Sequence, residues 1–179
     1  QDMRIWPERF ETGRNFANKV WNASRFCLMH LQGGPETVAA DLSEKDLDFT
    51  DKWILTRLHR AIERATSCAE DFRYCDFAHT IYEFVWNEFC DWYVEFVKGR
   101  LADPEAAPAA RRVLAFVLDR SLRLLHPVAP FITEELWRHL GDALPSRPLY
   151  GGLPTERKGP LIRSEWPEAE TVPFFEGVE

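Results

Sequence analysis

The sequence has no apolar run approaching the roughly 20 residues that a membrane-spanning helix requires, although 45% of its 179 residues are hydrophobic. Its first ten residues, QDMRIWPERF, lack the basic-then-apolar order of a secretory signal peptide. We therefore expect no membrane partner and a cytoplasmic location. Because the chain begins with Gln rather than Met, we also expect it to be part of a larger protein.

Cysteine is scarce, and its spacing excludes two common uses. The four cysteines are Cys27, Cys68, Cys75 and Cys90. No two of them form a Cys-x-x-Cys pair, the spacing typical of zinc sites and redox motifs. Three of them fall inside helix-like patterns, which indicates buried thiols in a reducing compartment rather than disulfides.

The motifs that carry common catalytic sites are also missing. The sequence contains no Walker loop and no GxGxxG, HExxH or GxSxG pattern. None of the five histidines follows a glutamate by three residues, which excludes the di-iron sites that some helical bundles hold. We therefore expect no catalytic residue, no metal ion and no cofactor in this chain. An enzyme of an unfamiliar kind is the alternative that this absence disfavours.

Positive charge is in deficit, with 22 Lys and Arg against 29 Asp and Glu, a formal net charge of -7 and a pI near 5.3. An acidic chain does not coat nucleic acid indiscriminately, so any nucleic-acid binding must come from a local basic patch. One stretch is a candidate because it contains no acidic residue. It is Gly13–Leu31, nineteen residues long.

Placed on a helix at about 100° per residue, this stretch has two different sides. The apolar side contains Phe16, Val20, Ala23, Cys27 and Leu31. The other side contains Arg14, Asn15, Asn18, Lys19, Asn22 and Arg25, with Phe26 and Met29 among them. Cations bind phosphates, amides bind base edges and an aromatic ring stacks on an unpaired base, so this side suits RNA. On composition alone, an ordinary solvated helix face that lacks acids remains the simpler interpretation.

The apolar periodicity predicts an all-α fold of about five helices in residues 1–141. The segments run from a start between Pro7 and Gly13 to Gly33, from a cap at Thr50 to about Phe72, from a cap at Asp76 to about Lys98, from Ala106–Ala110 to His126, and from about Phe131 to Leu140. Residues 142–179 are rich in Gly and Pro and predict an irregular C-terminal strap that packs on the bundle or extends from it, with room for one short strand.

The third segment is apolar on more than one side, so we expect it to be the central helix. Its aromatic residues are expected in the core with residues of the neighbouring helices. The residues expected to be buried are Trp53, Phe84, Phe89, Trp92 and Leu118.

Three blocks resemble a known family. They are GRNFANKVWNASRF at 13–26, YEFVWNEFCDWYVEFVK at 82–98 and LLHPVAPFITEELW at 124–137. Together they resemble the helical anticodon-binding domain of class I aminoacyl-tRNA synthetases, and the first two are closer to the valyl-tRNA synthetase branch than to the leucyl and isoleucyl branches. The resemblance extends over about residues 8–141. It departs from the family's usual pattern in a longer strap and in the absence of a C-terminal coiled-coil arm, which should weaken tRNA binding.

The resemblance implies that this part recognises the anticodon stem-loop of tRNA(Val). Activation of valine with ATP and charging of the tRNA would belong to a separate catalytic domain of the parent chain, whose HxGH and KMSKS loops are absent here. The partners implied are tRNA(Val) and that catalytic domain, with ATP bound only there, and the protein is expected to be a monomer. A structural bundle that merely packs on a neighbouring domain is the competing hypothesis.

In this family, residues of the first helix face the anticodon loop. The candidate tRNA-binding residues are therefore Arg14, Asn18, Lys19, Asn22, Arg25 and Phe26. Phe26 lies outside the apolar arc of the helix, so an exposed ring that stacks on an anticodon base is expected. The alternative is that Phe26 packs under the loop at 36–50 and is structural.

Overall fold

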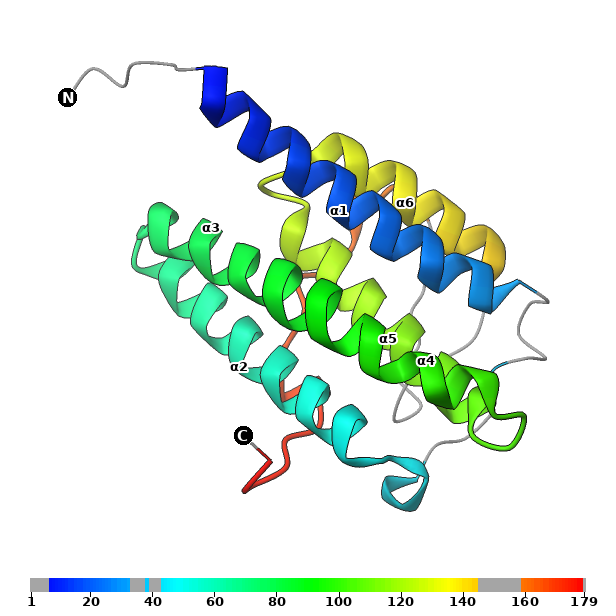
Figure 1. Ribbon diagram of the computed structural model, residues 1–179. Helices are drawn as coiled ribbons and strands as arrows, with labels where there is room; N and C mark the ends of the chain where they lie inside the picture. The colour runs from blue at the N-terminus through cyan, green and yellow to red at the C-terminus, as the bar shows by residue number, and fades with distance from the viewer. Residues whose placement is uncertain (1–6, 33–37, 39–42, 145–158, 179) are drawn as a thin grey trace.

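The computed structural model describes residues 7–32, 38, 43–144 and 159–178. Helices α3, η3 and α4 follow one another without a break, so the described residues form five long helices and contain no strand (Figure 1). The predicted all-α fold is confirmed. The elements of the bundle are α1 (Pro7–Leu31), the short η2 (Glu44–Asp46), α2 (Phe49–Glu70), α3 (Tyr74–Glu83), η3 (Phe84–Tyr93), α4 (Val94–Ala102), α5 (Ala107–Leu125) and α6 (Pro130–Ala143).

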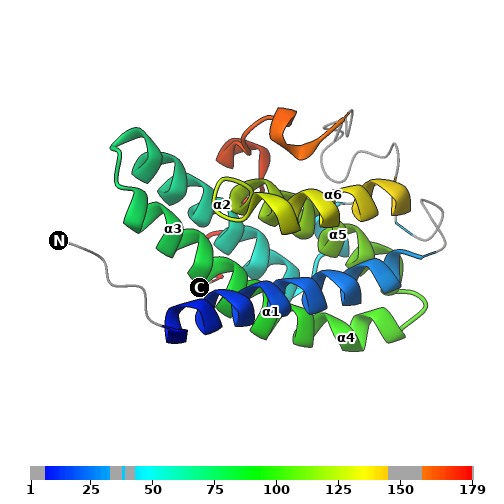
Figure 2. The same cartoon turned by 90° about the horizontal axis from the view of Figure 1, so that it is seen from above.

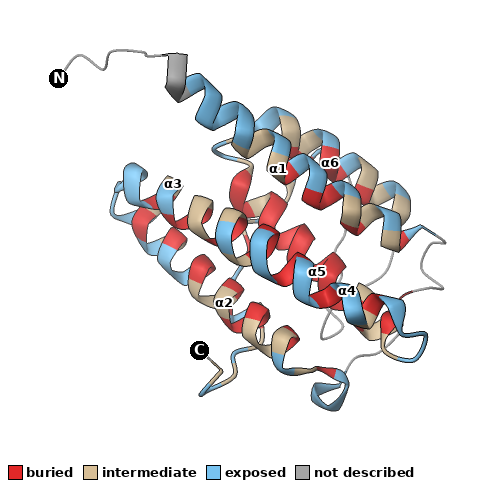
Figure 3. Cartoon of the chain, viewed as in Figure 1, coloured by how far each residue is buried: buried red, intermediate tan, exposed pale blue. Residues whose placement is uncertain are grey.

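Helix α5 is the centre of the bundle. It contacts α1, α2, α3, α4 and α6, and 15 of its 19 residues are buried, which Figure 3 shows as a helix coloured as buried over most of its length. The prediction that the third segment is central is therefore wrong. The extra apolar side chains of that segment lie at the surface, for the reason given below.

The helix caps differ by a few residues from those predicted. Helix α2 is capped by Asp48, which accepts a hydrogen bond from the backbone N–H of Asp51 (2.8 Å), and not by Thr50. Helix α3 begins at Tyr74, two residues before Asp76, because the chain turns sharply at Phe72, which has a positive φ of 57°. Short side chains near a helix start compete to be the cap, so the chain pattern alone leaves such positions uncertain by a residue or two.

The joined third helix departs from α geometry at its centre. A step of four residues advances by about 40° around an α-helix, so five such steps would carry an apolar pattern to the opposite side. Here the pattern stays on the core side because η3 is a π-helix, in which hydrogen bonds join residues i and i+5 and the winding is looser. The buried positions, four residues apart, are Ile81, Val85, Phe89, Tyr93, Val97 and Leu101.

This register decides which aromatic residues are buried. Phe84, Phe89 and Leu118 are buried as predicted. Trp53 is half-buried. The prediction for Trp92 is wrong, since its side chain is 55% exposed while Tyr93 beside it is fully buried. The three-residue step from Phe89 to Trp92 belongs to an α-helix and not to the π-helix that is present.

The described part of the C-terminal strap, residues 159–178, packs on the bundle and follows α2 in the opposite direction. The indole Nε1 of Trp166 donates to Thr66 Oγ1 (2.8 Å). Further along the strap, the backbone N–H of Phe175 donates to Thr56 Oγ1 (3.1 Å). Figure 2 shows the first half of this segment, in orange, on the side of the bundle opposite α1.

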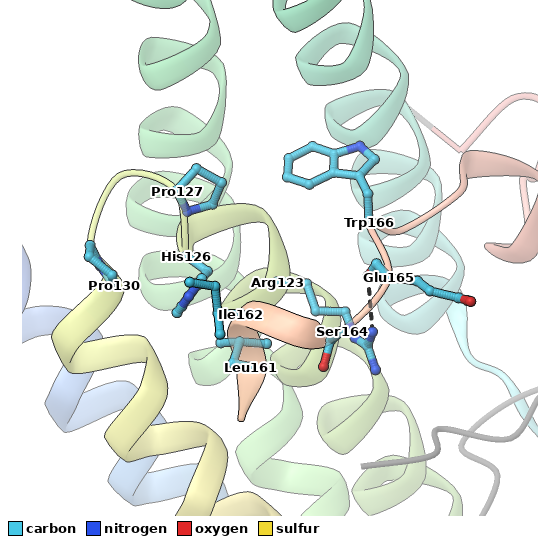
Figure 4. A pocket seen from close by; sticks show the side chains of 9 residues that line it. All are labelled: Arg123, His126, Pro127, Pro130, Leu161, Ile162, Ser164, Glu165 and Trp166. Carbon is cyan, nitrogen blue, oxygen red and sulfur yellow. Dashed lines mark hydrogen bonds between the residues drawn. The ribbon is translucent and has the colours of Figure 1, made fainter. Parts of the chain in front are cut away.

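The strap contains two 3-10 turns, η4 (Leu161–Arg163) and η5 (Ala169–Thr171), and its described residues include no strand. It closes over the α5–α6 turn, where the Arg123 guanidinium donates to the Glu165 carbonyl (3.0 Å) and a cavity of about 430 Å³ remains (Figure 4). The division of the chain at residue 141 stays a prediction, and the residues 145–158 of the expected longer connection lie outside the described part.

Candidate nucleic-acid interface

A polar stripe runs along the outer surface of α1. Arg14, Asn18, Asn22 and Arg25 are all exposed, and their spacing of four, four and three residues places them within about 80° of one another around the helix. Figure 3 shows this side of α1 largely in the colour of exposed residues. Four of the six predicted tRNA-binding residues therefore share one solvent-facing stripe, which we call the α1 stripe.

The α1 stripe presents two guanidinium groups and two amides to solvent. Arg14 lies 3.9 Å from Glu11, and both side chains are more than 60% exposed. A charge pair this open is weak, so it leaves the guanidinium available to another anion. The stripe thus combines donors for phosphate with groups that both donate and accept hydrogen bonds.

Lys19 lies beside the α1 stripe and not on it. Its side chain is 22% exposed and sits in the groove between α1 and η3. There its Nζ is 2.5 Å from Asp91 Oδ1 and 3.7 Å from the centroid of the Trp86 ring. Lys19 is therefore already paired with a carboxylate and an aromatic face.

Three aromatic rings form the wall of this groove. The ring centroids of Phe16 and Tyr82 are 5.0 Å apart, those of Tyr82 and Trp86 are 5.6 Å apart, and those of Phe16 and Trp86 are 6.0 Å apart. The ring planes lie within 28° of one another. Stacked rings of this kind hold each other in place, so the ring below Lys19 has a fixed position.

Phe26 does not have the exposed ring that the sequence led us to expect. It is half-buried and packs against the hydrophobic core. Its ring meets the His30 ring edge-on with centroids 4.6 Å apart, and Lys98 Nζ lies 5.8 Å from its centroid. Burial, together with the charge of Arg111, lowers the pKa of His30, which favours a neutral imidazole against the Phe26 ring. A role for Phe26 in binding RNA stays a prediction.

The structure adds Trp21 to the candidate interface. Its side chain is 39% exposed and lines a groove of about 510 Å³ between α1 and α6, together with Arg25, Met29 and His139. The His139 ring stands edge-on to the indole, with centroids 6.4 Å apart. The sequence analysis did not select Trp21 because it borders the apolar side of the helix. The available signal was its position four residues before Arg25, about 40° away around the helix.

Other kinds of site were sought in the same part of the chain. Among the described residues, no group of three or more His, Cys, Asp or Glu side chains is placed to hold a metal ion. Within that part of the chain, none of the helices is long and apolar enough to cross a membrane.

Comparison with known proteins bears on what the α1 stripe does. Residues 51–177 match the family model described as the anticodon-binding domain of tRNA ligase. The chain belongs to this family. The match includes the strap as far as residue 177, so this anticodon-binding domain extends beyond the blocks that carried the sequence resemblance.

Valine–tRNA ligases are among the relatives of this anticodon-binding domain. It is 50% identical over 143 residues to the enzyme of Geobacillus kaustophilus, which covers 78% of this chain and 16% of the relative. It is 46% identical over 142 residues to the enzyme of Bacillus subtilis, with the same coverage, and 42% identical over 171 residues to that of Bacillus licheniformis, covering 94% of this chain and 18% of the relative. The chain thus spans about one sixth of the length of these relatives, and the resemblance to the valyl branch is confirmed.

Proposed function

We propose that this chain is the tRNA-recognising part of a valine–tRNA ligase and binds the anticodon stem-loop of tRNA(Val). The observation that carries the proposal is the α1 stripe, an exposed row of cations and amides on an acid-free stretch of an otherwise acidic chain. The family match supplies the class of ligand.

The chemistry of the α1 stripe suggests a division of roles. Arg14 and Arg25 are suited to backbone phosphates, which they hold whatever the base sequence. Asn18 and Asn22 lie between the two arginines along the helix and carry the donor and acceptor groups that discriminate base edges. Trp21, in its groove beside Arg25, offers an indole ring on which an unpaired base can stack.

The whole reaction of a ligase extends beyond this chain. We infer that the chain by itself binds tRNA without charging it, because it corresponds to about one sixth of the valine–tRNA ligases that it resembles. Valine activation with ATP would take place in the catalytic domain of the parent enzyme, which is then the second partner. The chain would act as a monomer in the cytoplasm, where translation takes place.

Binding of short RNA hairpins by the 179-residue chain tests the proposal. We expect fluorescence anisotropy to show tighter binding of the tRNA(Val) anticodon stem-loop than of a stem-loop with replaced anticodon bases. Asn22→Ala should reduce this discrimination, whereas Arg25→Gln should weaken binding of both hairpins equally. Arg64→Gln, which removes an exposed charge from α2, is the matched control and should change neither.

The salt dependence gives a further test. Two or three cations neutralise few phosphates, so the log–log slope of affinity against salt should be shallower than about -4. A slope near -10, or equal affinity for the two hairpins, would contradict recognition by the α1 stripe.

A second role is favoured by a different observation, at the end of the bundle where α1 begins (Figure 1). Large apolar side chains are exposed in the α2–α3 and α5–α6 turns there, around a cavity of about 680 Å³. They are Phe72, Tyr74, Val128 and Phe131, with exposures of 75%, 63%, 48% and 92%. The positive φ of Phe72 is unfavourable for a bulky residue and holds its ring in solvent.

We infer that this end docks on the catalytic domain of the parent ligase, because exposed apolar patches mark protein contacts. The double variant Phe72→Ser, Phe131→Ser in the full-length enzyme should charge tRNA more slowly, while the 179-residue chain with the same changes binds the stem-loop normally. An unchanged charging rate would overturn this second role.

A further inference from the structure

Lys19 and Arg14 are both cations of α1, but an acid holds them very differently. The carboxylate of Asp91 is 2.5 Å from Lys19 Nζ, whereas that of Glu11 is 3.9 Å from Arg14. Lys19 is 22% exposed, so its pair is partly shielded from water, while Asp91 is 49% exposed at the mouth of the groove. The acid that neutralises Lys19 therefore faces solvent, where a phosphate would approach.

The groove also fixes where the Lys19 ammonium lies. Its Nζ is 3.7 Å from the centroid of the Trp86 ring, which is itself stacked on Tyr82 and Phe16. A cation held over an aromatic face keeps its position when its counter-ion is exchanged. Asp91 can thus be replaced by another anion without Lys19 having to move.

The position of Lys19 relative to the α1 stripe decides which anion could replace Asp91. Lys19 follows Asn18 in the chain and lies about 60° around the helix from Asn22. An RNA backbone held by Arg14 and Arg25 would therefore pass beside the Lys19–Asp91 pair. An RNA held in any other register would meet a neutral pair with an exposed carboxylate.

We propose that Asp91 is a specificity-determining residue of this interface: it occupies Lys19 until a phosphate of correctly seated RNA displaces it. The proposal rests on the proposed function of the α1 stripe. RNA seated on the stripe holds one phosphate close to Lys19 at a high local concentration, and that phosphate takes the place of Asp91. RNA that is not seated gains nothing from Lys19 and is repelled by the carboxylate, which widens the difference between the two affinities.

Binding of two hairpins by variants of the 179-residue chain tests this proposal. One hairpin is the tRNA(Val) anticodon stem-loop, and the other is an unrelated stem-loop of equal length. Asp91→Asn keeps the shape of the side chain and frees Lys19, so binding of the unrelated hairpin should tighten about fivefold, with a salt slope steeper by about one unit. Binding of the tRNA(Val) hairpin should tighten less than twofold.

Lys19→Met separates this effect from a general change of charge. In the wild-type background it should weaken the tRNA(Val) hairpin and leave the unrelated hairpin unchanged, because Lys19 is occupied by Asp91 there. Combined with Asp91→Asn, it should cancel most of the gain. Glu95→Gln is the matched control, since it removes one negative charge from an acid that pairs with Lys98 one turn further along, and it should change neither affinity by more than twofold.

Each result has a definite meaning. If Asp91→Asn tightens both hairpins equally, or neither, the discriminating role of Asp91 is overturned while recognition by the α1 stripe stands. If the wild-type chain binds neither hairpin, the proposed function fails and this inference fails with it. Circular dichroism with an unchanged thermal midpoint confirms that Asp91→Asn, at a half-exposed position, has not altered the fold.

Discussion

The neighbours Trp92 and Tyr93 give a sharp test of the π-helical register. Tyr93 is fully buried and its hydroxyl donates to Asp51 Oδ1 (2.8 Å), whereas Trp92 is 55% exposed and its ring meets the ring of Phe96 with centroids 5.6 Å apart. Truncating a fully buried aromatic residue costs about 3–5 kcal/mol. Tyr93→Ala should therefore lower the free energy of unfolding by about 4 kcal/mol. Trp92→Ala removes mostly exposed surface and should lower it by about 1 kcal/mol or less.

Tyr93→Phe separates packing from hydrogen bonding at the same position. It leaves the ring in place but removes a hydrogen bond to a buried carboxylate, an interaction worth about 1.5–3 kcal/mol. Asp51 also pairs with Arg100, so we expect a loss near the lower end, about 1.5 kcal/mol.

Urea unfolding followed by circular dichroism measures all three changes. With a denaturant slope of about 2 kcal/mol per molar, the unfolding midpoint should fall by about 2 M for Tyr93→Ala and by less than about 0.5 M for Trp92→Ala. If Trp92→Ala were as destabilising as Tyr93→Ala, the indole would be a core residue and the register described for η3 would be wrong.

Three further predictions concern single side chains. His30 has a pKa lowered by burial, so the unfolded chain takes up the proton first as the pH falls below about 6.5 and stability drops; His30→Gln should show a smaller loss of urea midpoint between pH 7.5 and pH 5.5 than the wild type, and an equal loss would contradict the burial of the imidazole. Cys75 is exposed while Cys27 and Cys90 are buried, and burial raises the pKa of Cys90 to about 12, so a thiol reagent at pH 8 should label Cys75 quickly and the two buried thiols only after unfolding. Phe26→Ala should cost about 2 kcal/mol of stability because its half-buried ring packs on the core; weaker RNA binding at an unchanged unfolding midpoint would restore the stacking role instead.

The sequence was sufficient to predict the helices and the polar side of α1. Apolar residues recur at three- and four-residue steps in each segment, and Pro and Gly mark the ends, as at Leu31, which ends α1 shortly before Gly33. The exposure of Arg14 and Arg25 also followed from their positions around the helix. These features depend on neighbours within a few turns, which a single sequence displays directly.

Other features depend on contacts that sequence spacing does not reveal. Lys19 looked like a free cation because the acid that pairs with it, Asp91, lies 72 positions away in the chain and approaches from another helix. Trp92 looked buried because the winding of η3 was taken to be that of an α-helix. A long run of four-residue steps, from Ile81 to Leu101, is the sequence signal that could have indicated the looser turn.

The strap has a consequence for the time at which this domain becomes complete during synthesis. Trp166 stacks on Phe77 with ring centroids 5.8 Å apart, and Leu161 and Val172 are buried, yet all three strap residues follow the last helix of the bundle in the chain. At about 5–20 residues per second, a ribosome needs roughly one to five seconds to add the residues between Ala143 and Trp166. During that interval the five helices have been made but the apolar surface of α2 and α3 beneath the strap is still open to solvent. A ribosome that stalls there would leave a bundle with a sticky side, a natural target for the chaperones that attend nascent chains.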